Sequence, residues 1–257
     1  MAVEGLGATV LRGLTGNLDL PRVKASGTAG WVAEHGAAAR SHAQLEKVSL
    51  APKTVTAEYE ISRRMMLQAT QLEAILRGDL GYLLAQALDG AAVKGGGANE
   101  PVGIIGTAGV PIVALGTNGA AITIDTAADL IGSVFDANAV GSGFLTNSKV
   151  QKAAMKLKDS QLRPFGVPAV FQNQPVAFSN QVPSNLTKGS GTNLSAIVYG
   201  NWADLVIAYW SAVDIVINPY HSDVASKGGA LIHAFLDADV ALRHAESFSV
   251  VKDAVAA

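Results

Sequence analysis

Residues 45–64 read LEKVSLAPKTVTAEYEISRR, and the rest of the fold can be built outward from this stretch. From Val55 to Ile61 every second residue is apolar and the residues between are polar, which is typical of a strand with one buried face. A shorter run over residues 45–50 also carries apolar side chains, and Pro52 separates the two runs. We therefore expect a long β-hairpin whose loop lies around residues 34–41.

The residues that follow predict a short helix and then a long one. Ser62 is suited to cap a short helix that runs through Leu67. From Gln71 to Val93 apolar residues recur at spacings of three and four, which is the period of an amphipathic helix. Gly78 and Gly81 lie inside it, and each costs about 1 kcal/mol relative to alanine. Packing against the rest of the chain must therefore stabilise this helix.

The remaining sequence predicts a mixed α+β architecture. Residues 1–26 contain several glycines and no sustained period, so we expect an extended arm. Three glycines over residues 95–97 end the long helix, and we place a structural boundary near residues 95–100. Beyond it we expect helices over residues 125–139, with Asp125 as the cap, and over residues 147–158. The predicted strands are short and cover residues 121–124, 144–146, 169–171, 176–179, 197–199, 205–210, 213–218, 230–237, 240–244 and 248–251.

The composition of the 257 residues excludes several classes of chemistry. No cysteine is present, which removes thiol nucleophiles, thiolate metal sites and disulfide frameworks. A formal net charge of -2 argues against a surface that is basic throughout, as a nucleic-acid platform requires. With 49% apolar and only 16% charged residues, we expect partners to cover part of the apolar surface. We find no secretory signal and no membrane span, and we expect a soluble protein made inside the cell.

Local motifs do not assemble into a catalytic or metal site. The five histidines lack the spacing of a metal-binding helix. Residues 141–143 read GSG, which is shorter than the Gly-x-Ser-x-Gly pattern of a nucleophile elbow, and residues 95–97 lack the Lys-Ser/Thr of a phosphate-binding loop. We therefore predict no catalytic residue, no cofactor and no metal. An α+β enzyme with a cleft in residues 100–220 stays open as a remote alternative, which requires polar groups that converge in space.

Four lysines form the one basic cluster, and they are Lys149, Lys152, Lys156 and Lys158. The first three share a face of a predicted helix. A solvated helix face is the commoner explanation, because no aromatic side chains for base stacking are interleaved with the lysines. A weak phosphate-facing patch close to a packaged polyanion is the minor hypothesis.

Seven short stretches occur in a characteristic order along nearly the whole chain. They are Gly30–Glu34 (GWVAE), Leu45–Lys53 (LEKVSLAPK), Ile61–Arg64 (ISRR), Asn99–Ile104 (NEPVGI), Leu157–Ser160 (LKDS), Tyr199–Asp204 (YGNWAD) and Ala245–Val251 (AESFSVV). In these motifs and their order, the chain resembles the major capsid proteins of tailed double-stranded DNA bacteriophages, which have the Hong Kong ninety-seven type fold.

The resemblance implies an α+β fold with four parts. These are an N-terminal arm at residues 1–26, an extended E-loop hairpin at 27–53, a P-domain with a long spine helix at 54–98 and 224–257, and an axial A-domain at 99–223. The implied function is structural and not enzymatic. Copies of the chain would self-assemble as hexamers and pentamers into an icosahedral head shell around double-stranded DNA. The virion is then the final location, after assembly in the cytoplasm of a bacterial host.

The resemblance also implies partners and contacts. Beyond other copies of the chain and non-specifically bound DNA, the implied partners are portal and scaffolding proteins, with a decoration protein as a further option and no membrane. Candidate contacts between subunits are Trp31 and Glu34 on the hairpin, with Arg63 and Arg64 near its base. Some relatives form Lys–Asn isopeptide crosslinks, but no such constellation can be assigned here, so we predict none.

Three alternatives remain within or near this family. Family precursors commonly carry an N-terminal scaffolding segment, and none is visible before Met1; we therefore expect either a processed form with an added methionine or a separate scaffolding protein. An encapsulin-type nanocompartment shell has the same fold, but its chains usually begin with a cargo-docking helix, which residues 1–26 do not predict. A phage tail or decoration protein would lack the order of hairpin and spine helix.

Overall fold

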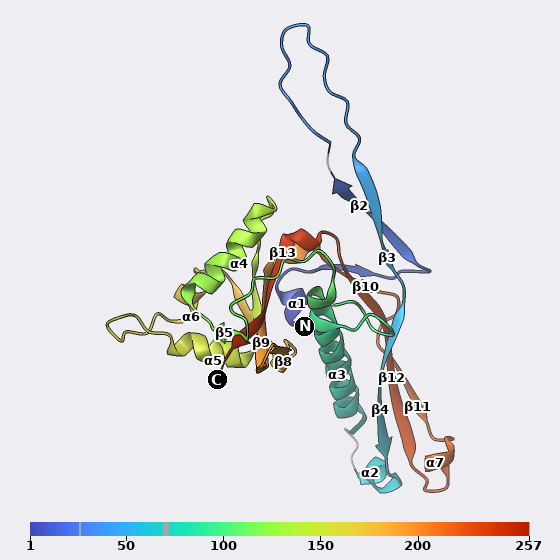
Figure 1. Ribbon diagram of the computed structural model, residues 1–257. Helices are drawn as coiled ribbons and strands as arrows, with labels where there is room; N and C mark the ends of the chain where they lie inside the picture. Colours follow the sequence, from blue (N-terminus) through green and yellow to red (C-terminus); the bar gives the residue numbers. More distant parts are fainter. Residues whose placement is uncertain (26, 69–71, 257) are drawn as a thin grey trace.

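A computed structural model describes residues 1–25, 27–68 and 72–256, and it shows an elongated molecule with a protruding hairpin (Figure 1). The helices are α1 (Ala2–Gly5), α2 (Arg63–Gln68), α3 (Leu72–Lys94), α4 (Ile124–Asp136), α5 (Ser148–Lys156), α6 (Val167–Val170) and α7 (Ser222–Ala225). The strands are β1 (Thr9–Arg12), β2 (Leu18–Ala25), β3 (Gln44–Leu50), β4 (Lys53–Ile61), β5 (Ala120–Ala121), β6 (Gly143–Thr146), β7 (Val176–Phe178), β8 (Leu186–Lys188), β9 (Gly191–Gly200), β10 (Leu205–Tyr209), β11 (Asp214–Asn218), β12 (Ala230–Leu242) and β13 (Phe248–Val255). The expected α+β class is confirmed.

The hairpin is built from β2 and β3, which pair antiparallel from Leu18 opposite Leu50 to Val23 opposite Leu45. The expected extended arm is therefore wrong for β2, and it is also wrong for α1 and β1, which form regular structure. The alternation of apolar and polar residues expected of a strand is interrupted in β2 by Pro21. A proline is tolerated there because each strand of a two-stranded ribbon has one unpaired edge, where the missing backbone N–H is not needed. Its partner strand also lies far along the sequence, across the loop.

The alternating strand β4 is confirmed, but its partner is not the strand before it. All nine of its residues pair antiparallel with β12, from Lys53 opposite Ala238 to Ile61 opposite Ala230. This pairing belongs to a five-stranded sheet that also contains β1, β10 and β11. The two strands expected at residues 230–237 and 240–244 are one continuous strand, β12, because it pairs with β4 and β11 at one end and β10 at the other.

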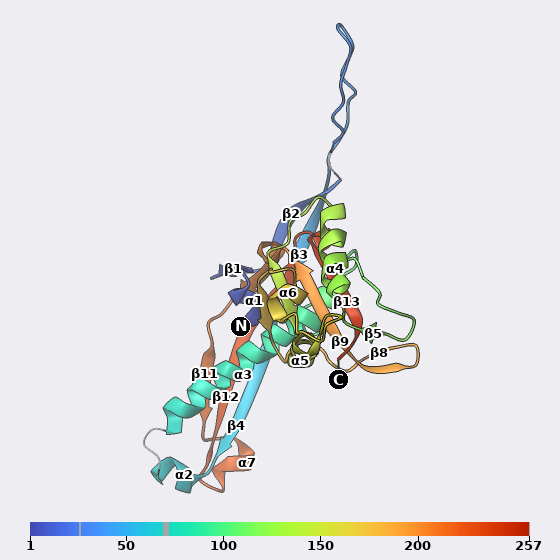
Figure 2. The same cartoon turned by 90° about the vertical axis from the view of Figure 1, so that its left-hand side faces the viewer.

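The long helix α3 lies along the five-stranded sheet, as Figure 2 shows. Its buried side chains include Leu80, Leu84 and Leu88, which join the largest apolar core of the molecule. The expected start at Gln71 lies outside the described residues. The helix ends at Lys94, and Gly95 then allows a close approach, because a Cβ atom there would lie 1.9 Å from the carbonyl oxygen of Pro101.

A six-stranded sheet forms the second unit, in the order β5, β13, β9, β6 and β7 with β8 added to β9. Helix α4 packs against β13 and β9, and α5 packs against α6. The C-terminal strand β13 therefore lies in this sheet, whereas β10 and β11 lie in the five-stranded sheet. The expected division of the chain, with 224–257 in the P-domain and 99–223 in the A-domain, is therefore wrong for these three strands. Each strand belongs to the sheet of the strand with which it pairs, and that partner lies far away in the sequence.

Local sequence signals also explain smaller differences between the predicted and the observed elements of the second unit. Thr123, and not Asp125, caps α4, since its hydroxyl accepts from the backbone N–H of Thr126 at 3.3 Å. The strand expected at 169–171 is the short helix α6, where Pro168 occupies a first-turn position that suits a residue without an N–H. The helix expected from Asn147 is confirmed as α5, and Asn147 is its cap, because its side chain accepts from Val150 N–H at 3.0 Å.

The N-terminal turn is anchored on the long helix. The carboxylate of Asp89 on α3 accepts from the backbone N–H groups of Ala2 and Val3, each at 3.1 Å, and Val3 is fully buried. A carboxylate at the start of a helix is favoured by the unpaired N–H groups there. In the described part of the chain, no helix is both long and apolar enough to cross a bilayer.

Candidate assembly surfaces

The tip of the hairpin stands away from the body of the molecule (Figures 1 and 2). Trp31 is fully exposed there, and more than half of the surface of Val32 is exposed. Glu34 lies in the turn beside them and is also exposed. A large aromatic side chain that is left in water gains stability when another surface covers it. The hairpin tip is therefore the first candidate assembly surface.

Charged pairs link the two strands of the hairpin. Arg22 donates to Glu46 at 2.9 Å, and this hydrogen bond, followed by the attraction of the same guanidinium, lowers the pKa of Glu46. Lys47 donates to Asp19 at 2.8 Å, and Ser49 also donates to it, so the pKa of Asp19 is lowered as well. Exposed pairs of this kind contribute little, and a two-stranded ribbon is marginal alone in water. Contacts beyond the ribbon must stabilise it.

The base of the hairpin is fixed to the five-stranded sheet by a polar joint and a small apolar cluster. Asp239 is only 3% exposed, and its carboxylate accepts from Lys53 Nζ at 2.8 Å and from the backbone N–H of Ala51 at 3.1 Å. Fully buried Leu50 packs with Val206 beside it. These contacts attach the base of the hairpin to the five-stranded sheet, and the sheet therefore sets the direction in which the hairpin leaves the molecule.

Arg63 and Arg64 lie at the other end of the molecule. They begin α2, whereas the hairpin base lies at Lys53, at the opposite end of β4 (Figure 1). Their expected place near the hairpin base is therefore wrong, because nine residues of strand, about 30 Å long, separate the two points. Both arginines are exposed, beside the half-exposed Met65 and Met66. This end is a separate candidate surface.

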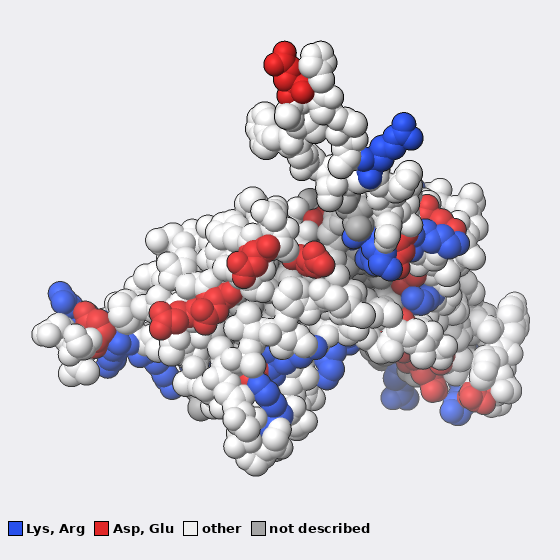
Figure 3. All heavy atoms as spheres, turned by 45° about the horizontal axis from the view of Figure 1, so that its top comes forward, with Lys and Arg blue, Asp and Glu red and all other residues white. Residues whose placement is uncertain are grey.

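The second unit presents two charged helices. On α4, the exposed side chains include Asp125, Asp129 and Asp136. On α5, Lys149, Lys152 and Lys156 are exposed, and Lys158 follows in the loop, where it forms a bridge with Pro164. Figure 3 shows the acidic side chains along the surface over α4 and basic side chains along the border below it. The structure thus brings the first three lysines together on one helix, as expected.

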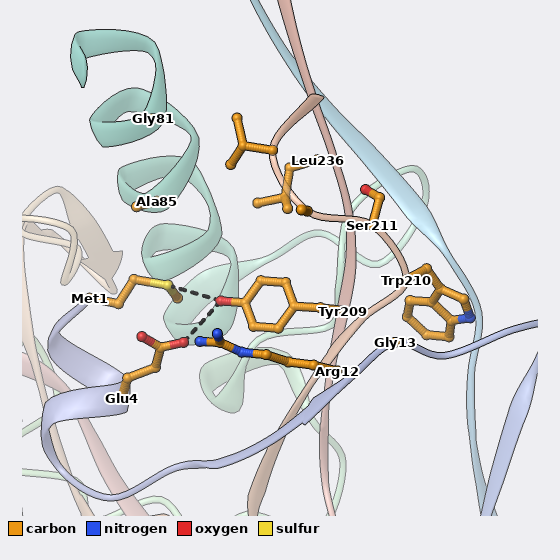
Figure 4. Close-up of a pocket in the computed structure, with 12 residues that line it drawn as sticks. Met1, Glu4, Arg12, Gly13, Gly81, Ala85, Tyr209, Trp210, Ser211 and Leu236 are labelled. Carbon is orange, nitrogen blue, oxygen red and sulfur yellow. Dashed lines mark hydrogen bonds between the residues drawn. The ribbon is translucent and has the colours of Figure 1, made fainter. Parts of the chain in front are cut away.

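A cavity of about 590 Å³ lies between the N-terminal segment, α3 and the five-stranded sheet (Figure 4). The hydroxyl of Tyr209 donates to Glu4 at 3.0 Å, and the guanidinium of Arg12 lies 5.7 Å from the centre of its ring. Burial, and then the hydrogen bond to Glu4, raise the pKa of Tyr209. The phenol is therefore held in its neutral form, and the group joins the N-terminal segment to β10.

Sequence reasoning missed this group and the buried carboxylates. Glu4 and Tyr209 are 205 residues apart, and Lys53 and Asp239 are 186 apart, so no local spacing relates them. The only available signal was the occurrence of acidic residues in a largely apolar strand, as at Asp237 and Asp239 in β12. Among the described residues, no group of three histidine, aspartate or glutamate side chains could hold a metal ion.

Known proteins match the chain over nearly its whole length. The sequence matches the group described as "Phage capsid family" over residues 3–253. It is 30% identical over 256 residues to a "Major capsid protein" of Halomonas phage phiHAP-1, covering 98% of this chain and 40% of the relative. It is 23% identical over 269 residues to a "Major capsid protein" of Klebsiella oxytoca phage phiKO2, covering 95% of this chain and 61% of the relative. The chain thus spans about two fifths and three fifths of these two curated relatives.

Solved structures share the fold at lower sequence identity. The protein in "Capsid of native GTA particle computed with C5 symmetry" has a TM-score of 0.79 at 20% identity, covering 99% of this chain and 90% of that one. A chain of Mycobacterium phage Ogopogo has a TM-score of 0.78 at 17% identity, covering 98% and 91%. The order of hairpin, long helix and two sheets is therefore that of the Hong Kong ninety-seven type fold. On the match over residues 3–253, the chain belongs to the phage capsid family.

Proposed function

We propose that the chain is the shell-forming part of the major capsid protein of a tailed bacteriophage. Copies associate as hexamers and pentamers into an icosahedral head shell that encloses double-stranded DNA. The observation that carries this proposal is the protruding hairpin with a fully exposed Trp31 at its tip. A ribbon that is marginal alone and apolar at its end is stabilised when it lies on a neighbouring copy. Family membership supports the same function.

The proposal gives each part of the fold a role. The hairpin is the E-loop, and Trp31 and Glu34 contact the neighbouring subunit. The five-stranded sheet with α3 is the core of the P-domain, and Arg63 and Arg64 contact another subunit from its far end. The six-stranded sheet with α4, α5 and α6 is the core of the A-domain and lies near the capsomer axis.

The remaining partners follow from a head shell of this type. Portal and scaffolding proteins and non-specifically bound DNA contact the shell, with a decoration protein as a further option. The shell assembles in the bacterial cytoplasm and becomes part of the virion. Catalysis is not part of the proposed role.

The test is assembly of the purified chain. Negative-stain microscopy and sedimentation velocity are expected to show closed shells, or rings of five or six copies that close into shells on crowding. A monodisperse monomer at high concentration would overturn the proposal. Shells that form and enclose a cargo protein in place of DNA in the host would instead favour the nanocompartment alternative.

A further inference from the structure

Charge is segregated along the sequence of the A-domain. No Lys or Arg occurs between Lys94 and Lys149, and no Asp or Glu occurs between Asp136 and Asp159. The fold places the acidic and the basic stretch on two different helices. Both helices pack on the same face of the six-stranded sheet with α6 between them, so that α4, the acidic edge, lies at one end of this helical layer and α5, the basic edge, at the other (Figures 1 and 2).

The acidic edge has no partner within the described part of the chain. Asp125, Asp129 and Asp136 are exposed, and none of them forms a described ion pair. Asp136 is the last residue of α4, where the helix dipole disfavours a carboxylate. Phe135 beside it is more than half exposed. A cationic surface with some apolar area would relieve both features.

The basic edge has the complementary character. Lys149 donates to the carbonyl oxygen of Ser184 at 3.4 Å, while Lys152 and Lys156 have no hydrogen-bond or ion-pair partner among the described residues. Met155 between them is more than half exposed. The edge therefore combines unpaired positive charge with an exposed apolar side chain, as the α4 edge combines negative charge with Phe135.

The spacing of the two edges also matches. Asp129 and Asp136 are seven residues apart on α4, and Lys149 and Lys156 are seven residues apart on α5. Each separation corresponds to about 10 Å along a helix axis. Two helices that lie side by side could therefore pair both charges at once. Because the two helices lie at opposite ends of one helical layer, such pairing joins successive copies in a ring.

We propose that the acidic face of α4 binds the basic face of α5 on the next copy of this chain around the capsomer axis. The inference rests on the proposed function and specifies one of its contacts. The hairpin leaves the body on the same side as α4 in both ribbon views, so one neighbour receives both the hairpin and the acidic face (Figures 1 and 2). Complementary charge would then set the orientation of subunits and speed their association.

Charge exchange within one chain tests the contact. Each variant is named after the face that it changes. The acidic variant carries Asp129→Lys and Asp136→Lys on α4, and the basic variant carries Lys149→Glu and Lys156→Glu on α5. The exchanged variant carries all four substitutions. At low salt, we expect each single-face variant to reduce the yield of capsomers at least tenfold. The exchanged variant should recover to within about twofold of the unmodified chain, because each copy again presents opposite charges. These figures are order-of-magnitude expectations for charge pairs at an interface.

A matched control separates this contact from net charge and from misfolding. Asp214→Lys, on an exposed residue of β11, makes the same change in net charge as each single substitution on α4, and should assemble normally. If the acidic variant fails to fold by circular dichroism, Asp129→Asn with Asp136→Asn replaces it, and a several-fold loss of capsomers is expected.

The outcomes are distinct. Normal capsomer yield in either single-face variant, or an exchanged variant as defective as its parents, would overturn the inference and leave the proposed function standing. Shells of the basic variant that form normally but package less DNA would overturn it in favour of a phosphate-facing lysine patch. If the unmodified chain stays monomeric, the proposed function fails, and the inference fails with it.

Discussion

Asp239 and Lys53 form an ion pair of 2.8 Å at the point where the hairpin meets the five-stranded sheet. Removing the Asp239 carboxylate would leave Lys53 Nζ and the N–H of Ala51 without their acceptor. We expect Asp239→Ala to lower the free energy of unfolding by about 2–3 kcal/mol, since charged hydrogen bonds at a buried site are lost. Asp239→Asn keeps an acceptor for Ala51 and should cost less. Urea unfolding of the unassembled chain measures both, and equal losses would contradict this account.

Two glycines around the long helix predict opposite effects of the same substitution. A Cβ atom at Gly95 would lie 1.9 Å from the carbonyl oxygen of Pro101, whereas no atom lies within 4 Å of one at Gly78. Gly95→Ala therefore forces the backbone apart, and we expect a loss of more than about 1 kcal/mol. Gly78→Ala removes the entropic cost of glycine in a helix and should stabilise by up to about 1 kcal/mol. Thermal unfolding compares the two, and a stabilising Gly95→Ala would refute the close approach.

Helices with strong local signals could be predicted from the sequence. For α3, Leu80, Leu84 and Leu88 recur every four residues on the face that packs on the sheet, although Ile75 of the same predicted period is exposed. For α5, the cap Asn147 stands before the helix. These signals act within a few residues, so they survive in almost any tertiary context. The spacing of Asp125, Asp129 and Asp136 also places them near one face of α4. The cap of α4 could not be predicted, because Thr123 and Asp125 are both suitable capping residues.

Strand pairing could not be predicted in the same way. The alternation in β4 shows that one face is buried, but it does not identify β12 as the partner. Likewise, nothing local separates β13, which pairs with β9, from the preceding β12, which pairs with β10. The same limitation placed Arg63 and Arg64 near the hairpin base. Their true position depends on the direction in which β4 leaves that base, which only the pairing with β12 determines.

The raised pKa of Tyr209 predicts a loss of folding stability in alkaline solution. Its pKa is raised above the ordinary value of 10.0, first by burial and then by the hydrogen bond to Glu4. A group whose pKa is higher in the folded chain stabilises the fold fully below pH 10, and this contribution is lost as the pH rises through the folded-state value. We expect the free energy of unfolding to fall above pH 10. The pKa values of Tyr59 and Tyr199 are raised as well, so the comparison uses Tyr209→Phe.

In Tyr209→Phe the hydrogen bond to Glu4 is lost at every pH, and stability at pH 7 should therefore decrease. The difference between the two proteins should shrink above pH 10, because the unmodified chain then loses the same contribution. Denaturant unfolding at several pH values checks this. A difference that stays constant up to pH 12 would show that Tyr209 does not titrate differently in the folded and unfolded chains.

Substitution of Trp31 distinguishes an effect on assembly from an effect on folding, since Trp31 is fully exposed at the hairpin tip. Trp31→Ala removes no described contact within the chain, so the free energy of unfolding of the unassembled protein should change by less than about 0.5 kcal/mol. If Trp31 is buried on a neighbouring copy, its removal costs about 2 kcal/mol or more at each contact, and the protein concentration needed for assembly rises at least tenfold. Trp31→Phe keeps an aromatic ring and should assemble nearly as well as the unmodified chain. Light scattering during assembly measures the threshold, and an unchanged threshold in Trp31→Ala would remove Trp31 from the contacts between subunits.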